Sequence, residues 1–214
     1  MNESSKSKIC IVFGLVFVLG FSTLMMRKSE QELVDSRHLI KYEIVWWAAV
    51  AAVLPYVLFI ERRPLSSVGY RRLGLRGVGI AVAAAILLMA GLALIFYVVV
   101  PALHLNMPQQ VNQLLALPLW CRVILVVRGV VAQELFYRGY GIERLQELTH
   151  SRAVAGITSC AFFTLANVPS WSWAPIIFVG FAGIILTLLY LWRRNLWINM
   201  ITHLVVDGVG VLAA

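Results

Sequence analysis

Long apolar stretches recur along this chain, and they constrain its fold more than any other feature. A helix needs about 20 predominantly apolar residues to cross the hydrocarbon core of a bilayer. Seven stretches approach or exceed that length, at 9–26, 39–60, 77–100, 117–138, 153–169, 174–192 and 195–213. Only 13% of the residues are charged, against roughly 25% in an average soluble domain. The sequence therefore predicts an all-α protein, a polytopic membrane helix bundle of about seven transmembrane helices, with residues 1–214 forming a single membrane domain.

The first stretch could alternatively be a secretory signal, because Lys6 and Lys8 precede its apolar run. The segment that follows it, FSTLMMRKSE, contains no small-x-small cleavage site. We therefore expect an uncleaved helix, whereas cleavage would leave six spans.

Basic residues between the stretches predict the orientation, because Lys and Arg are enriched in cytoplasmic loops. Two lysines precede span 1, and ten arginines follow spans 2, 4 and 6: Arg62, Arg63, Arg71, Arg72, Arg76, Arg138, Arg144, Arg152, Arg193 and Arg194. The segment 27–41, with four basic residues of its own, is the exception to this alternation. The pattern predicts an integral membrane protein with a cytoplasmic N-terminus, and a short chain without an organelle signal fits the bacterial inner membrane.

The net charge of +8 does not indicate a nucleic-acid partner, because the basic residues lie in short loops rather than on one soluble face. Membrane lipids with anionic headgroups are the expected partners. Cys10, Cys121 and Cys160 lie in apolar runs and are expected to be small buried residues. No HExxH or CxxC spacing occurs. We therefore expect no metal and no cofactor; zinc would require Glu134, His203 and Asp207 to converge as ligands.

Polar residues inside the spans are candidates for a functional site, because ionisable side chains at membrane depth are costly unless they face partners or water. The fourth span ends in VVAQELFYRGYG, which contains Gln133, Glu134 and Arg138. Four residues separate Glu134 from Arg138, so on a helix they share a face and neutralise each other. The alternatives are a purely structural ion pair and, for Arg122 and Arg128 of the same span, contact with lipid headgroups.

Two later spans carry further polar groups. FFTLANVPSW places Asn167 one helical turn after Phe163, where it could serve only as hydrogen-bonded packing between helices. NLWINMITHLVVDGVG places Asn199, His203 and Asp207 at i, i+4 and i+8, so one polar stripe follows the helix. An acid one turn from an imidazole can fix its tautomer and favour its protonated form. This pairing favours a functional histidine over a structural one.

Taken in order, the segments QELFYR (133–138), FTLAN (163–167) and HLVVD (203–207) resemble the motifs of the CPBP family, the CAAX-protease and bacteriocin-processing membrane proteins. That family has Glu-Glu-x-x-x-Arg on one helix, Phe-x-x-x-His on a later one, and His-x-x-x-Asn or Asp near the end. The resemblance makes residues 61–214 a CPBP-like core and 1–60 two N-terminal helices outside the motif region. It implies a glutamate-type intramembrane endopeptidase that acts on a membrane-anchored peptide or protein, with a polar cavity between spans 4, 5 and 7.

Two positions depart from the family pattern. The resemblance assigns water activation to the first Glu and the first His, where this chain has Gln133 and Asn167, and oxyanion stabilisation to the positions of His203 and Asp207. Amides cannot exchange a proton near neutral pH, whereas a general base contributes roughly 10²–10⁴-fold. Glu134 would not simply replace the missing carboxylate, because one residue turns a side chain by about 100° on an α-helix. We therefore expect a scaffold that binds its peptide but cleaves it slowly or not at all.

The sequence leaves two explanations open. The chain is either a silenced version of a working protease or a non-catalytic peptide-binding or immunity protein that keeps the hydrogen-bonded pocket. A small transporter that uses the buried charges as a relay is a third class, which an inverted repeat would support. The sequence shows no such repeat.

Overall fold

Helices form all the regular structure in the part of the chain that the computed structural model describes, which is residues 3–31, 36–105, 114–167 and 173–212. The α-helices are α1 (Glu3–Gln31), α2 (Ser36–Pro55), α3 (Leu75–Leu94), α4 (Val100–Ala102), α6 (Leu119–Gln133), α7 (Glu143–Thr149), α8 (Arg152–Ala166), α9 (Trp173–Arg193) and α10 (Leu196–Leu212). A 3₁₀ turn, η2, covers Leu65–Val68, and π-helical segments cover Tyr56–Ile60 (η1), Ile95–Val99 (η3) and Glu134–Ile142 (η4).

Four described helices are long and apolar enough to span a membrane, at Ser7–Met25, Leu39–Ile60, Leu75–Ala102 and Ile176–Arg193. They confirm four of the predicted spans to within two residues at every end. Arg152–Ala166 and Leu196–Leu212 are shorter apolar helices at the places of the fifth and seventh spans, so the exact number of seven is not confirmed. Large apolar side chains also face outward, including Leu87, Tyr97 and Ile157, each more than 70% exposed. Helices that are apolar on their outer surface belong in lipid, and this is an integral membrane protein.

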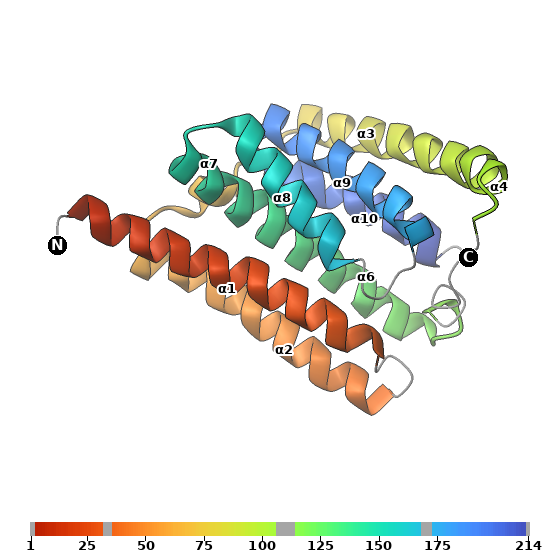
Figure 1. Ribbon diagram of the computed structural model, residues 1–214, viewed down its shortest axis with the longest axis horizontal. Coiled ribbons are helices and arrows are strands. Elements are labelled where there is room, and N and C mark those ends of the chain that lie inside the picture. Colours follow the sequence, from red (N-terminus) through yellow and green to blue (C-terminus); the bar gives the residue numbers. More distant parts are fainter. Residues whose placement is uncertain (1–2, 32–35, 106–113, 168–172, 213–214) are drawn as a thin grey trace.

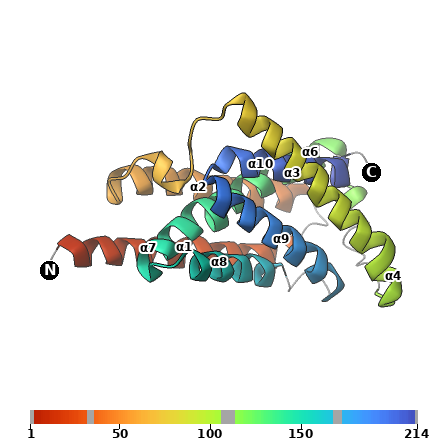
Figure 2. The ribbon, with the colours of Figure 1, turned by 90° about the horizontal axis from the view of Figure 1, so that it is seen from above.

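The helices pack as a bundle in which α1 and α2 lie side by side on one flank and α3 lies on the opposite flank (Figure 1). Between these flanks run α6, α8, α9 and α10. Seen from above, α9 and α10 lie beside α3, while α8 lies beside α1 (Figure 2). This arrangement brings the three motif-bearing helices together, because α8 and α10 both contact η4 and α10 also contacts α6.

The fourth predicted span is part of one continuous helix that runs through α6, η4 and α7, from Leu119 to Thr149. The segment η4 bonds i to i+5 for nine residues, and all nine are buried. Single π-bulges occur frequently at functional sites. The sequence placed Glu134 on regular α-helix, whereas the structure places it at the first residue of η4. Its own φ of −67° and ψ of −41° stay in the α region and its N–H bonds to the Val130 oxygen, so the wider winding begins only after this residue.

Two glycines allow η4 to pack closely against its neighbours. A Cβ atom on Gly139 would lie 2.7 Å from the backbone oxygen of Val68 in η2, and one on Gly141 would lie 2.7 Å from the backbone oxygen of Phe136. Both distances are well inside ordinary van der Waals contact. Gly139 therefore lets the connection between α2 and α3 dock on the motif helix, whereas Gly141 leaves room within η4 itself.

That connection, residues 61–74, is rich in arginine, and η2 forms a short helix within it; we call it the elbow. A buried ion pair joins it to η4 and α7, with Arg144 Nη2 2.6 Å from Glu61 Oε2. Tyr140 donates a 2.7 Å hydrogen bond to Glu61 Oε1, and Arg144 donates a 3.0 Å bond to the Ser67 hydroxyl. We call Glu61, Ser67, Tyr140 and Arg144 the elbow network. It holds the elbow against the C-terminal part of the motif helix.

Two of the arginines after span 4 were counted as loop charges in the orientation prediction, but they are buried. Arg138 and Arg144 are 1% and 2% exposed and both are paired with acids. They therefore do not act as free loop charges, because their side chains point into the bundle. Of the arginines counted for the orientation, Arg62, Arg71, Arg72, Arg76 and Arg152 are exposed, and the orientation stays a prediction.

The N-terminal helices contribute polar partners inside the bundle. Arg128 Nε lies 2.9 Å from Glu43 Oε1 of α2, and its guanidinium lies over the Trp46 ring at 5.1 Å. Tyr137 donates a 2.9 Å hydrogen bond to the hydroxyl of Ser22 in α1. The interpretation of Arg128 as a headgroup ligand is therefore wrong, because a carboxylate on α2 neutralises it within the bundle. Glu43 is an acid inside span 2, and such a residue is itself a signal of a buried polar partner.

Candidate functional site

Glu134 lies at the centre of a hydrogen-bonded cluster and is fully buried, with 0% exposure. Its Oε1 accepts a 3.0 Å hydrogen bond from Arg138 Nη1 and lies 2.9 Å from His203 Nδ1. Its Oε2 accepts a 3.1 Å bond from Asn199 Nδ2. The carboxylate thus has three polar partners, two of them on α10. We call Glu134, Arg138, Asn199, His203 and Asp207 the central cluster.

Arg138 connects the cluster to the second motif helix. Its Nη2 lies 3.3 Å from the backbone oxygen of Gly183 in α9. Its guanidinium lies over the Phe163 ring, 4.3 Å from the ring centre, in a cation–π arrangement. Phe163 opens the FTLAN segment on α8, so all three motif segments meet around one Arg–Glu pair.

His203 lies between two carboxylates. Its Nδ1 faces Glu134, and its Nε2 is 3.2 Å from Asp207 Oδ2. An imidazole can donate from both nitrogens only when it is protonated. In that state the cluster contains two positive groups, Arg138 and His203, and two negative groups, so its charges balance. The side chain of Asp207 is 39% exposed, which makes it the open end of an otherwise buried chain of polar groups.

Gln133 and Asn167 stand apart from the central cluster. Gln133 is the last residue of α6 and is half-buried, and its side chain makes no hydrogen bond within the described ranges. Asn167 caps the C-terminus of α8, and its Nδ2 donates a 2.7 Å bond to the backbone oxygen of Phe163. The structure therefore brings Glu134, Arg138, His203 and Asp207 together, but hydrogen-bonds neither amide to them.

Two contacts of this region escaped the sequence analysis. Asn199 was part of the predicted stripe on span 7 but was not named as a site residue; its spacing of four from His203 is the signal that could have included it. Arg122 donates a 2.8 Å bond to the backbone oxygen of Val211 near the end of α10. That oxygen belongs to the last turn of the helix, where carbonyl groups lack intrahelical donors.

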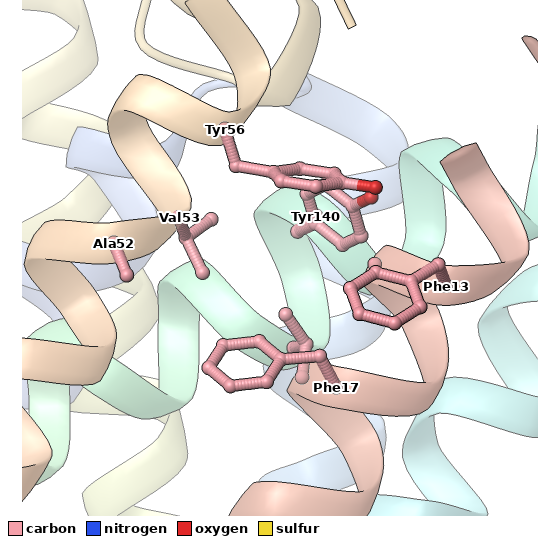
Figure 3. A pocket seen from close by; sticks show the side chains of 8 residues that line it. Phe13, Phe17, Ala52, Val53, Tyr56 and Tyr140 are labelled. Atoms are coloured by element: carbon pink, nitrogen blue, oxygen red, sulfur yellow. The ribbon is translucent and has the colours of Figure 1, made fainter. Parts of the chain in front are cut away.

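The cavities we describe are apolar grooves rather than polar chambers. One of about 160 Å³ lies between α1, α2 with η1, and η4, where Phe13, Phe17, Tyr56 and Tyr140 line it (Figure 3). A larger groove of about 830 Å³ lies between α8 and α9, lined by residues such as Ile157, Thr164 and Leu188. The polar cavity expected between spans 4, 5 and 7 stays a prediction.

The donor set of the central cluster is that of an ion-pair network. Within the described ranges, no group of three His, Cys, Asp or Glu side chains is arranged to hold a metal ion. Cys10, Cys121 and Cys160 are free, and Cys121 alone of the three is fully buried. The cluster can hold and move charge, and it can donate hydrogen bonds to a developing anion.

Fold and site together define the class: a helical integral membrane protein with a buried Glu–Arg–His–Asp cluster shared by helices that are distant in sequence. Residues 115–209 match the family model described as Rce1-like, type II CAAX prenyl endopeptidase Rce1-like. The matched segment contains all three motifs, in agreement with their resemblance to the CPBP family. Searches of curated proteins and of solved structures found no match.

Proposed function

We propose that this protein is a CAAX-protease-type intramembrane endopeptidase scaffold whose hydrolytic step is impaired. A working site of this kind would hydrolyse a peptide bond of a membrane-associated substrate by activating water. The observation that supports impairment most strongly is the environment of Glu134, whose two oxygens accept from Arg138, His203 and Asn199. A carboxylate engaged in this way is a poor acceptor for a proton from water.

The positions that would activate water hold amides. Gln133 and Asn167 have no group that gains or loses a proton near neutral pH. Since Glu134 is committed to its three partners, it does not supply the missing base. The loss of a general base lowers a rate by roughly 10²–10⁴-fold.

The remaining cluster suits the second half of the reaction. A protonated His203, held by Glu134 and Asp207, would donate from a ring nitrogen to the oxyanion that forms when a carbonyl is attacked. Preorganised donors of this kind stabilise the transition state because they need no reorganisation. Arg138 would keep Glu134 charged, and no organic cofactor or covalent intermediate is required.

The location follows the same proposal. We place the chain in a bacterial inner membrane with its N-terminus in the cytoplasm, as a single membrane domain in which residues 61–214 form the core. The exposed arginines of the elbow support this orientation through the preference of basic residues for the cytoplasmic side. The substrate would be a membrane-anchored peptide or protein, and anionic lipids would contact the elbow.

Restoring both amides tests the impaired-protease proposal. Gln133→Glu with Asn167→His, in membranes with a prenylated C-terminal peptide as the candidate substrate, should release product at a rate well above that of the parent chain. Each single change should give little, because water activation needs both groups. His203→Gln added to the restored form should abolish the gain. A restored form that cleaves nothing the parent leaves intact would refute the proposal.

A non-catalytic peptide-binding or immunity role is the second candidate, and the buried hydrogen bond of Asn167 to its own helix is what favours it. That bond holds an amide at the position where the family pattern has a histidine. For this role, photocrosslinking to the same peptide should fall when Gln133 or Asn167 becomes Leu. Unchanged yields in both variants would count against it.

A further inference from the structure

The central cluster contains one buried residue that the family motifs leave without a role. We propose that Asn199 is a positioning residue, which fixes the rotation of the Glu134 carboxylate so that Oε1 faces His203 and Arg138. The inference deepens the proposed function, since it concerns how the same site keeps its oxyanion-stabilising histidine in place.

Asn199 bridges two acceptors on different elements. Its Nδ2 donates a 3.1 Å hydrogen bond to Glu134 Oε2 and a 2.7 Å bond to the backbone oxygen of Leu186 in α9. The residue is 0% exposed, so no solvent competes for these bonds. A donor shared between a carboxylate and a fixed backbone carbonyl holds the carboxylate at a set place relative to α9.

The orientation of the amide follows from its neighbours. Both atoms opposite Nδ2 are oxygens that can only accept here, so turning the amide over would set Oδ1 against two acceptors. Oδ1 itself is buried and has no hydrogen-bond partner in the described part of the chain. Leaving the buried Oδ1 unpaired is costly. The amide nevertheless keeps this orientation, because only this orientation lets Nδ2 donate both hydrogen bonds.

The backbone of α9 acts as a common reference for both groups that hold Glu134. Arg138 lies against the carbonyl of Gly183, and Asn199 donates to the carbonyl of Leu186, one helical turn further along. The terminal torsion of a glutamate is soft and has broad minima. Without Asn199, only the partners on Oε1 would oppose rotation of the carboxylate, and the 2.9 Å contact with His203 Nδ1 would lose its fixed geometry.

Ring-nitrogen NMR of His203 tests this role without requiring cleavage. Histidine labelled with ¹⁵N in the ring, with His203→Gln for assignment, reports the hydrogen bond at Nδ1 in detergent micelles. Asn199→Leu is expected to shift the Nδ1 resonance. Thr202→Val is the matched control, since Thr202 is equally buried on α10 but bonds to the backbone oxygen of Ala81 in α3. It should leave the resonance unchanged.

A folded Asn199→Leu variant with the parent's Nδ1 resonance would overturn the proposal. If Asn199→Leu fails to fold, Asn199→Ser decides, because its shorter hydroxyl cannot reach both acceptors: the shift must appear there as well. In the Gln133→Glu/Asn167→His form, Asn199→Leu should lower kcat by about 10²-fold with KM nearly unchanged, as for a small misplacement of a reacting group. The NMR result stands whether or not that form is active, so the two proposals fail separately.

Discussion

The central cluster and the elbow network are built around the same unit, a buried Glu–Arg pair, yet they differ in how the pair is completed. Glu134 and Arg138 are 0% and 1% exposed, and Glu61 and Arg144 are each 2% exposed in their side chains. In the elbow network the remaining partners are hydroxyl groups: Tyr140 donates to Glu61, and Arg144 donates to Ser67. Around Glu134 the remaining partners are an amide and the titratable ring of His203.

This difference separates an architectural pair from a candidate site. The elbow network joins three segments, and neutral hydroxyl groups of Tyr140 and Ser67 complete the hydrogen bonding of its ion pair. The central cluster continues from Glu134 through His203 to the partly exposed Asp207, so it has an opening toward its surroundings. In this protein, His203 links the Glu134–Arg138 pair to the partly exposed Asp207, and this link is what makes the central cluster the candidate site.

Removing one charge of the elbow network should have the largest effect on stability. Glu61→Leu leaves Arg144 buried without a counter-charge, and the free energy of unfolding should fall by about 3–5 kcal/mol. Denaturation in detergent micelles measures this. The double variant Glu61→Leu/Arg144→Met removes both charges and should lose much less. Equal losses in the single and double variants would show that the pair is not what holds the elbow.

A methyl group at the junction of the two regions should have the next largest effect. Gly139→Ala places a Cβ atom 2.7 Å from the Val68 backbone oxygen, and overpacking of this kind typically costs about 1–3 kcal/mol. Gly129→Ala, where no atom lies within 4 Å of the added carbon, is the control and should gain about 0.5–1 kcal/mol in its helix. Similar unfolding midpoints for the two variants would mean that the elbow does not dock tightly on η4.

The interaction energy between Glu134 and His203 should be a smaller effect that also distinguishes the two regions. Glu134→Gln and His203→Gln should be non-additive, with an interaction energy of about 0.5–3 kcal/mol, because the two side chains share a hydrogen bond. Glu61→Gln combined with His203→Gln should be additive, since the two residues share no partner. A double-mutant cycle on unfolding free energies provides both values. Additivity at the central cluster would contradict the 2.9 Å contact.

The smallest effect should come from an exposed pair at the same end as the elbow network. Arg63 donates a 2.6 Å hydrogen bond to Glu147 Oε1, and this bond lowers the pKa of the Glu147 carboxyl below its ordinary value of 4.5. A lowered folded-state pKa stabilises the fold above 4.5, and the contribution is lost as the pH falls below that value. Because both side chains are partly exposed, unfolding midpoints should drop only slightly in acid, and Arg63→Gln should remove that part of the drop. An unchanged acid profile in Arg63→Gln would exclude the contribution.

Much of the fold could be predicted because helical spans are local. Apolar length alone located the helices that the structure shows at Ser7–Met25, Leu39–Ile60, Leu75–Ala102 and Ile176–Arg193. The spacing of four correctly paired Glu134 with Arg138 and His203 with Asp207, since residues one turn apart meet on any helix. The partnership of Arg128 with Glu43 was missed, because the two residues are distant in sequence and meet only when α2 packs on α6.

The sequence by itself determined that the chain is a set of lipid-soluble helices with a few polar residues at fixed spacings, because hydrophobicity and helical period are written along the chain. Tertiary structure alone decided which of those polar residues share a hydrogen bond. Packing of α10 against η4 gave Glu134 its contacts with His203 and Asn199, while Gln133 and Asn167 stayed outside the central cluster. Which polar groups meet depends on how helices that are distant in sequence pack together, and this is not encoded in a short motif.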